Sequence, residues 1–504
     1  MLSEKKIYNQ YSLLKSNAWK LCKENKMELA LDCVKTACVL AKQYYLCFTD
    51  ASLEKIVREI GEHCLPRTIV VGKSGRYLFY DTHTTDNIAL TQQYLGALVS
   101  WGVDFLYITT KKMDRPGANL IRLLIDSSPH GQYVEVLEHS NYLETANSIV
   151  QIVREFQPEK TFIQTTSDDV SGILAWNTIE GIERYYIDLS DHSFWLGVSA
   201  ADYYITFRSY GYNICCLHRG IDKDKVLVQP FYPVTKAASF QGIPEVSRDS
   251  VKILSGGRLD KIYGKGDTYF DLVASVLKEN SNSEFFFAGG GAFGKLGRSR
   301  YIEKQVEKYG IADRFHLLGF RKDIVELMQK MDIYMGTYPM GGGLMTQLAV
   351  REGVPIVQYV SEGLSNSVGE FVDCCDRNQS FVFDNKTDFL EEAKKLINDK
   401  VYRRERGTEI QSKILSASRF DTELYQLLFN KNSQYKVSEY FVDLSQVRKN
   451  QIEIENDVTH DFPRIIVKSR YMRKKQPLKY LKNVLAFLWY SDKKWLLTKL
   501  RGKY

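Results

Sequence analysis

Two series of short apolar runs, in which helical stretches separate each run from the next, constrain the fold of this 504-residue sequence more than any other feature. The first series has apolar runs at residues 77–80, 103–108, 161–164, 185–188 and 203–206. The segments between them, such as 143–156, have apolar residues three and four positions apart, which is the period of an amphipathic helix. Short buried strands that alternate with helices form parallel sheets. The pattern predicts an α/β domain over residues 68–235.

A second alternating series follows, with apolar runs at residues 251–255, 284–288, 315–318, 333–336 and 355–359. It predicts another doubly wound α/β domain over residues 236–430. Ligands of such sheets bind outside the carboxyl ends of the strands. We therefore expect two Rossmann-like domains that face a cleft, with ligand sites at the carboxyl ends of both sheets.

The two ends of the chain differ from these domains. Residues 1–67 have helical spacing of apolar residues without strand-like alternation, and Pro66 ends the region. This predicts a helical N-terminal extension, which offers a surface for an acceptor or a protein partner. Residues 431–463 are polar and weakly periodic, as is typical of a linker, and the predicted region 431–504 ends in a basic amphipathic tail.

Charge is distributed unevenly along the chain. The net charge is +7, but residues 464–504 hold thirteen Lys and Arg against one acid, Asp492, so this segment carries +12 and the rest −5. A mildly acidic body argues against nucleic acid as a partner. The N-terminus leads into polar helix, and no window has the roughly 18 apolar residues of a membrane span. We expect a cytoplasmic protein.

A glycine-rich turn with several cations follows the first strand of the second domain, at residues 255–266. A diphosphate needs small residues for close backbone approach and fixed positive charge. Gly257 supplies the first requirement. Arg258 offers a bidentate fork, and Lys265 or Lys261 a mobile ammonium. The alternative is a surface loop with incidental basic residues.

Two more glycine turns follow later strands of the same domain. One contains Gly290, and the other contains Gly341, Gly342 and Gly343 before a helix that runs to Arg351. Backbone N–H groups at that helix start would receive a phosphate, with Thr346 adding a hydroxyl. One such loop is weak support, but three at the carboxyl ends of successive strands converge on one place.

With these motifs in order from Gly256 to Val357, the sequence resembles the nucleotide-sugar-binding domain of GT-B glycosyltransferases. The resemblance implies that Arg258 and Lys265 bind the donor diphosphate and that the backbone of Phe320 and Arg321 contacts the base. It implies transfer of a monosaccharide from a nucleoside diphosphate sugar, with UDP expected, to a glycan, a lipid-linked or a protein acceptor. GT-B enzymes generally need no metal, so we expect neither a metal nor another cofactor.

The sequence departs from the family pattern at one point. Retaining members usually carry a Glu-x7-Glu motif, and its positions here hold Met340 and Leu348. Gln347 is the nearest polar substitute, with Glu352 and Glu362 as alternatives. The glycine loop, Thr346 and residues 363–369 partly resemble the inverting protein O-GlcNAc and bacterial N-glucosyltransferase group. This favours inversion.

Inverting transfer needs a base on the acceptor side, after a strand of the first domain. His192 is the first candidate because histidine titrates near neutral pH. It follows Asp191, and Trp195 could stack on a sugar.

The second candidate is the segment with His83, Thr85 and Asp86 after the first strand. For both histidines, the alternative is a hydrogen-bonding structural role.

The tail has an amphipathic stretch at residues 477–490. Leu478, Leu481, Leu485, Leu488 and Trp489 share one helical face beside lysines, a composition suited to an anionic membrane surface. Association with the inner face of the membrane would suit a lipid-linked acceptor. The alternative is a terminal helix packed on the domains.

Two other functions remain open. A GT-B-like subunit that binds a transferase or its acceptor protein without catalysis would tolerate Met340 and Leu348. A nucleotide-sugar epimerase of the same fold would need several acids in the cleft, and the usual acids of the donor side are absent from this sequence.

Overall fold

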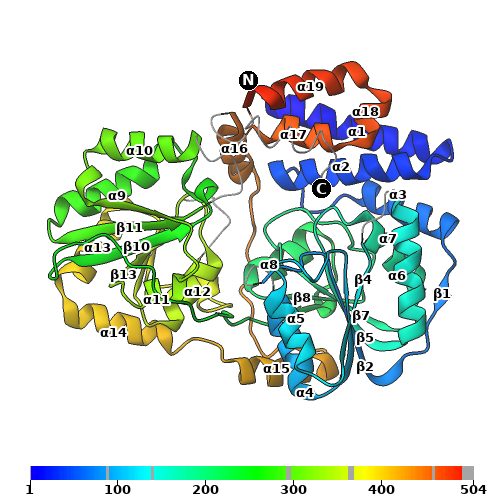
Figure 1. Cartoon of the computed structure of the whole chain (residues 1–504), viewed down its shortest axis with the longest axis horizontal. Helices are drawn as coiled ribbons and strands as arrows, with labels where there is room; N and C mark the ends of the chain where they lie inside the picture. The colour runs from blue at the N-terminus through cyan, green and yellow to red at the C-terminus, as the bar shows by residue number, and fades with distance from the viewer. Residues whose placement is uncertain are drawn as a thin grey trace. The chain divides into compact units, whose positions relative to one another are not determined.

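The computed structural model describes residues 2–86, 90–137, 141–290, 297–360, 368–456 and 460–490. The chain forms two compact units (Figure 1). Unit 1 consists of Met1–Phe231, Ser416–Leu444 and His460–Tyr490. Unit 2 consists of Tyr232–Leu415, Ser445–Thr459 and Ser491–Tyr504.

Unit 1 is built on a seven-stranded parallel sheet in the order β4-β3-β2-β5-β7-β8-β9. The strands are β2 (Lys73–Asp81), β3 (Asp104–Thr109), β4 (Gly131–Glu135), β5 (Pro158–Gln164), β7 (Glu183–Ile187), β8 (Tyr203–Thr206) and β9 (Val226–Val228). The short strands β1 (Thr68–Ile69) and β6 (Ile179–Glu180) pair separately. Strand order reverses between β2 and β5, which is the switch point where doubly wound sheets bind ligands.

Helices cover both faces of this sheet, because its central strands are buried on both sides. Helices α4 (Thr91–Trp101) and α5 (Asn119–Asp126) lie on one side, and α6 (Tyr142–Phe156) and α7 (Val170–Thr178) on the other (Figure 1). Aromatic rings from adjacent strands fill the interior, as where Phe79 meets Phe162 edge to face at 6.1 Å.

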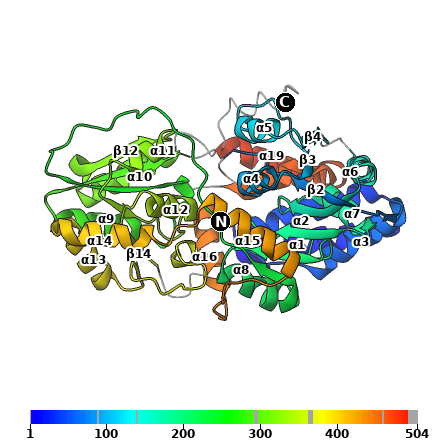
Figure 2. The same ribbon diagram turned by 90° about the horizontal axis from the view of Figure 1, so that it is seen from below.

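The N-terminal region folds as three helices, α1 (Glu4–Lys23), α2 (Met27–Tyr44) and α3 (Ala51–Cys64). The C-terminal helices α17 (Asp461–Lys468), α18 (Arg470–Lys475) and α19 (Pro477–Tyr490) lie beside them (Figures 1 and 2). The Asp32 carboxylate of α2 accepts hydrogen bonds from the Ser469 hydroxyl (2.8 Å) and the Tyr471 amide (2.7 Å). Helices from opposite parts of the sequence therefore share one helical layer.

Unit 2 contains a six-stranded parallel sheet in the order β12-β11-β10-β13-β14-β15, the Rossmann order 3-2-1-4-5-6. The strands are β10 (Val251–Gly257), β11 (Ser283–Gly289), β12 (Phe315–Gly319), β13 (Ile333–Met335), β14 (Ile356–Tyr359) and β15 (Val382–Phe383). Its helices are α9 (Thr268–Glu279), α10 (Gly297–Tyr309), α11 (Ile324–Met328), α12 (Gly343–Arg351), α13 (Lys386–Asn398) and α14 (Lys400–Gln411). The switch point lies between β10 and β13.

The chain passes between the units more often than the predicted domain ranges imply. Helix α15 (Ala417–Asn430) belongs to unit 1, although its residues lie within the predicted second domain. It packs against α4, where Phe420 meets Tyr94 edge to face at 5.5 Å. The predicted linker contains α16 (Ser445–Ile454), which belongs to unit 2. Tertiary packing of apolar side chains decides both assignments.

Candidate functional site

The carboxyl ends of β10 and β11 in unit 2 approach each other so closely that only glycine fits. A Cβ on Gly256 would lie 2.5 Å from the Ala288 carbonyl oxygen, and one on Gly289 would lie 2.5 Å from the carbonyl oxygen of Gly257. The Gly256 position also faces Met345 of α12, at 3.3 Å. The ends of these two strands and the start of α12 therefore meet, as the sequence predicts.

Lys261 provides the cation of this region. It lies in a short 3-10 helix after β10, and its ammonium donates a 2.9 Å hydrogen bond to the Gly341 carbonyl. Burial lowers the pKa of Lys261 to about 8, with Arg258 adding to the effect and Asp260 opposing it. Among the described residues no carboxylate forms an ion pair with this ammonium. An added anion would therefore stabilise it.

The other two predicted cations are placed differently. Arg258 is 61 % exposed and makes a bidentate pair with Asp260, at 2.9 and 2.7 Å. Lys265 lies one residue before Gly266, whose amide donates to the Glu453 carboxylate of α16 at 3.2 Å. The sequence offered either Lys265 or Lys261 as a ligand of the diphosphate. Of the two, Lys261 is the one whose ammonium reaches the glycine loop.

The glycine loop leads directly into α12. Gly342 is the N-cap residue, and Gly343 begins the helix. The first amides of a helix and its dipole attract anions. Thr346, in the first turn, is fully buried, and its hydroxyl lies beside the buried hydroxyl of Tyr334. The loop, the helix start and Lys261 thus form one group, which we call the glycine cradle (Lys261, Gly341–Gly343 and Thr346).

Gly290 and Phe320 also lie together, at the ends of β11 and β12. A Cβ on Gly290 would lie 3.0 Å from the Phe320 Cβ, and the Phe320 side chain is 75 % exposed. The Arg321 guanidinium has a structural role, since it pairs with Asp323 and donates to the Gly242 carbonyl at 2.8 Å. This pairing lowers the pKa of Asp323 to about 2.

The candidate replacements for the missing acids lie in different surroundings. Leu348 is buried in the core of unit 2, which explains why an acid is not tolerated there. Gln347 donates to the Phe371 carbonyl at 3.3 Å. Glu352 caps the opposite end of α12 and accepts from Gln329 at 2.9 Å. Glu362 lies outside the described residues.

In unit 1, the predicted base His192 lies in the loop after β7. Its side chain is 42 % exposed, and Nδ1 lies 3.3 Å from Oδ1 of the buried Asp191. Arg208 pairs with the same carboxylate, at 2.6 Å through Nε. Burial by itself raises the pKa of Asp191, but the charges of Arg208 and His192 outweigh it and lower the value to about 2. The carboxylate remains ionised and orients the imidazole.

A second buried ion pair supports the same loop. Arg219 binds Asp188 at 2.9 Å, and both side chains are fully buried. Trp195 donates to Asp188 at 2.9 Å, stacks on Tyr186 at 4.2 Å and lies under the Arg219 guanidinium at 4.4 Å. Trp195 is only 1 % exposed, so its N–H and its ring make contacts within the core. The ring is not accessible for the stacking on a sugar that the sequence had suggested. The sequence offered no sign of the two arginine pairs, because their partners are distant along the chain.

The second candidate segment lies at the switch point of unit 1, after β2. His83 Nε2 lies 3.1 Å from the Thr165 carbonyl, after β5. Burial lowers the pKa of His83, and Asp81 opposes the shift. The Thr85 hydroxyl donates to the His83 carbonyl at 2.8 Å.

Asp86 has a structural role beside this segment. Its carboxylate accepts from the amides of Leu120 and Ile121, both at 3.1 Å, at the start of α5. These contacts satisfy amides that the first turn of a helix leaves without partners.

Comparison with solved structures identifies the fold. A mutant form of Thermobaculum terrenum O-GlcNAc transferase matches with a TM-score of 0.53 at 12 % identity, over 84 % of this chain and 81 % of that one. Anabaena HepE in complex with UDP and glucose matches with a TM-score of 0.53 at 13 % identity, over 70 % of this chain and 99 % of that one. The chain has a GT-B fold. The predicted fold class is confirmed.

A third similar structure is that of a glycosyltransferase from Rickettsia africae. It matches with a TM-score of 0.52 at 11 % identity, over 71 % of this chain and 98 % of that one. No protein-family profile matches the GT-B chain, and no curated protein sequence does. The similarity is therefore one of fold.

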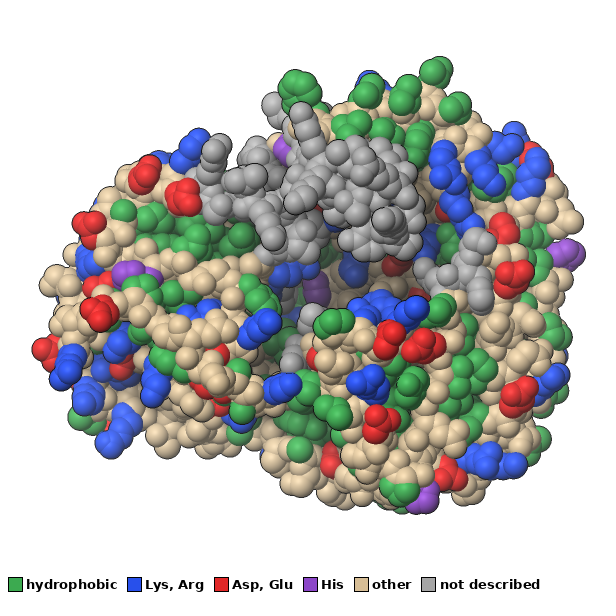
Figure 3. Space-filling view, in the orientation of Figure 1, with side chains coloured by type: hydrophobic (Ala, Val, Ile, Leu, Met, Phe, Trp, Pro, Cys, Tyr) green, Lys and Arg blue, Asp and Glu red, His purple; other side chains and the backbone are tan. Residues whose placement is uncertain are grey.

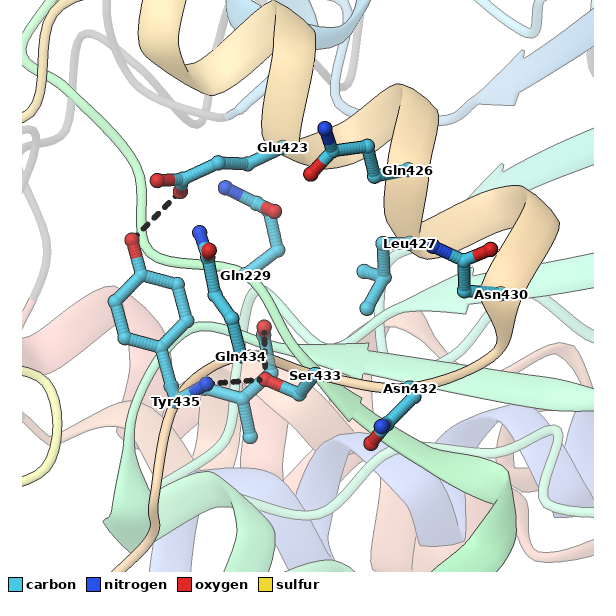
Figure 4. A pocket seen from close by; sticks show the side chains of 10 residues that line it. Gln229, Glu423, Gln426, Leu427, Asn430, Asn432, Ser433, Gln434 and Tyr435 are labelled. Atoms are coloured by element: carbon cyan, nitrogen blue, oxygen red, sulfur yellow. Dashed lines mark hydrogen bonds between the residues drawn. The ribbon is translucent and has the colours of Figure 1, made fainter.

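Unit 1 of the GT-B chain also has a polar pocket of about 370 Å³ beyond the end of β9 (Figure 4). Its lining includes five carboxamides, which are Gln229, Gln426, Asn430, Asn432 and Gln434. The Tyr435 hydroxyl donates to Glu423 at 2.6 Å across it. None of the predicted site residues lines this pocket.

In the parts of the GT-B chain that the structure describes, no group of three or more His, Cys, Asp or Glu side chains is placed to hold a metal ion. Over the same residues, no helix combines the length and the apolar character needed to cross a bilayer.

Proposed function

We propose that this GT-B chain transfers a monosaccharide from a UDP-sugar to a glycan, lipid-linked or protein acceptor, with inversion and without a metal. One observation supports the proposal most directly. The partly buried ammonium of Lys261 lies against the glycine loop at the start of α12 without a carboxylate partner among the described residues. A buried charge without a partner is costly, so such a site is suited to an anion.

The glycine cradle has the properties that a diphosphate requires. Lys261 provides positive charge, and the first amides of α12 provide hydrogen-bond donors. The cradle lies at the switch point of a sheet with Rossmann strand order. UDP is proposed as the nucleotide because HepE, a structural relative, binds UDP in its crystal structure.

The proposed chemistry uses groups of this chain alone. The acceptor oxygen or nitrogen attacks the anomeric carbon of the sugar, and the bond from that carbon to the phosphate oxygen breaks. The acceptor proton moves to His192, which the ionised Asp191 orients. UDP leaves with the bonding electrons, and the Lys261 ammonium stabilises the charge that develops on the diphosphate.

Donor binding tests the cradle. We expect Lys261→Met to weaken UDP affinity about 10- to 100-fold, since hydrogen bonds to charged groups contribute about 1.5–3 kcal/mol. Titration calorimetry with UDP measures this. Lys278→Met, an exposed lysine on α9, is the matched control and should bind UDP like the wild type. Equal affinity in Lys261→Met, or no nucleotide binding by the wild type, would contradict the proposal.

Turnover tests the base separately. Release of UDP from UDP-glucose and UDP-N-acetylglucosamine, with water or added glycans as acceptor, measures transfer. We expect His192→Ala to reduce kcat by about 10²- to 10⁴-fold with little change in UDP affinity. Unchanged turnover would exclude His192 as the base, and retention of the anomeric configuration in the product would exclude inversion.

A second candidate function is a non-catalytic subunit that binds a transferase or its acceptor protein. The observation that favours it is the pair Met340 and Leu348, at the positions where retaining relatives carry acids. Tight UDP binding without release of UDP from any UDP-sugar would support this alternative.

A further inference from the structure

Helix α19 presents an apolar face to solvent, although it is folded against the protein. Its exposed side chains are Leu478 (85 %), Leu481 (54 %), Leu485 (60 %) and Trp489 (85 %). At 100° per residue these four positions fall within an arc of about 80° on one side of the helix. Large apolar side chains gathered on one face mark an interaction site more often than a solvated surface.

The opposite side of α19 accounts for its attachment to unit 1. Phe487 lies about 180° from Leu478 around the helix and is 7 % exposed. This side packs against α17 and α18 (Figure 1). One face of α19 therefore attaches the helix to unit 1. The apolar side chains on the exposed face make little contribution to that attachment.

Positive charge lies beside the exposed face. Residues 473–490 include five cations and no acid, and the cations are Arg473, Lys474, Lys475, Lys479 and Lys482, all exposed. Lys482 borders the apolar arc directly, 40° from Leu478. In Figure 3 apolar side chains gather along the upper edge over α19, with Lys and Arg side chains beside them.

We propose that α19 docks this protein onto an anionic phospholipid surface, with Leu478, Leu481, Leu485 and Trp489 entering the interfacial region. A helix with an apolar face, an interfacial Trp and flanking cations lies in the plane of a membrane. Each cation near an anionic surface increases affinity about fivefold at moderate salt. A second copy of the chain is a poorer occupant, since two such faces would bring two sets of cations together.

This proposal stands apart from the nucleotide site. It depends on the described residues of α18 and α19 alone, and no part of it requires UDP or catalysis. The affinity for vesicles should therefore be the same in the wild type and in Lys261→Met.

Sedimentation of the full chain with vesicles tests the proposal. Vesicles of phosphatidylcholine with 30 % phosphatidylglycerol are compared with phosphatidylcholine alone. We expect binding to the anionic vesicles only, weakened by raising NaCl. The variant Leu481→Ser/Leu485→Ser/Trp489→Ser should bind at least tenfold more weakly and melt at the same temperature, because all three side chains face solvent.

The matched control removes three other exposed apolar side chains of unit 1, as Ile69→Ser/Val71→Ser/Leu123→Ser, whose exposures are 71 %, 76 % and 60 %. It should bind anionic vesicles like the wild type. Lys479→Gln/Lys482→Gln should bind more weakly at low salt but not at high salt. The proposal is overturned if the wild type ignores anionic vesicles or if the triple variant of α19 binds equally. A dimer that the triple variant dissociates, without vesicle binding, would assign the face to a second copy instead.

Discussion

Each unit holds cations that are buried or partly buried, but these cations have different partners. In unit 1, Arg208 and Arg219 are almost completely buried and each binds a buried aspartate, at 2.6 and 2.9 Å. In unit 2, the Lys261 ammonium has a carbonyl oxygen as its hydrogen-bond acceptor, and none of the described carboxylates pairs with it. The charges of the two arginines in unit 1 are therefore neutralised within the protein, whereas the described residues offer the Lys261 ammonium no carboxylate.

This difference separates structural cations from binding cations. A buried arginine whose charge is neutralised within the protein holds a loop in place, and here that loop carries His192. A partly buried lysine with a lowered pKa and no carboxylate partner reduces stability, and such groups are typical of functional sites. Arg258 is intermediate, because its guanidinium is exposed and already paired with Asp260.

The largest expected effect is on stability. Arg208→Met leaves the Asp191 carboxylate buried without its main partner, so we expect a loss of about 3–5 kcal/mol in the free energy of unfolding. Lys261→Met removes a partly buried charge that has no carboxylate partner among the described residues, and it should leave the free energy of unfolding unchanged or higher. Denaturant unfolding followed by circular dichroism measures both. A comparable loss in the two variants would erase the distinction between the two kinds of cation.

The pH dependence of UDP affinity is the second way to sharpen the comparison. The pKa of Lys261 is about 8, below its ordinary 10.5 because of burial, so the amine loses its proton as the pH rises through 8. UDP affinity should fall over that range towards that of Lys261→Met, a change of about 10- to 100-fold. Calorimetry from pH 6.5 to pH 10 measures it.

The free energy of unfolding should change with pH in the opposite direction to UDP affinity. A lowered lysine pKa makes the charged form unfavourable in the folded state, so this penalty is present below pH 8 and disappears as the pH rises towards 10.5. Lys261→Arg keeps its charge and should show neither trend. A UDP affinity that is flat across pH 8 in the wild type would argue against a role for the ammonium.

The smallest expected effect is on UDP affinity when the ion pair between Arg258 and Asp260 is removed. Asp260→Asn removes the carboxylate that occupies its guanidinium and one negative charge near the glycine cradle. We expect UDP affinity to increase about three- to fivefold, within the range of an exposed ion pair. Stability should change by less than about 0.5 kcal/mol. Weaker UDP binding in this variant would mean that the Arg258–Asp260 pair itself shapes the site.

The course of the sheets could be predicted from the sequence because burial on both faces leaves a continuous apolar run. Most of the predicted runs correspond to strands, among them residues 315–318 within β12 (Phe315–Gly319). The strands β4, β9 and β15 were not predicted. All three lie at the edges of their sheets. β4 is largely exposed, and β9 and β15 span only three and two residues, which is too short for a clear apolar run.

The candidate site could be predicted only in part. Glycines at the ends of β10 and β11 mark the site in the sequence, since a Cβ there would clash with a backbone carbonyl. The sequence could not distinguish Lys261 from Lys265, because both lie in one turn. Only the path of that turn in the tertiary structure decides which ammonium reaches Gly341. The burial of Trp195 was likewise hidden, as it depends on Arg219, 24 positions later.

By itself the sequence determined the two alternating series, the glycine turns and the basic, amphipathic character of residues 477–490, because local periodicity and composition encode these properties. Only the tertiary structure decided which charges are paired. It joined Asp191 to Arg208 and Asp188 to Arg219 and left Lys261 beside a carbonyl. It also decided that α19 exposes its apolar face. Pairing and exposure depend on contacts between distant segments, which no local pattern records.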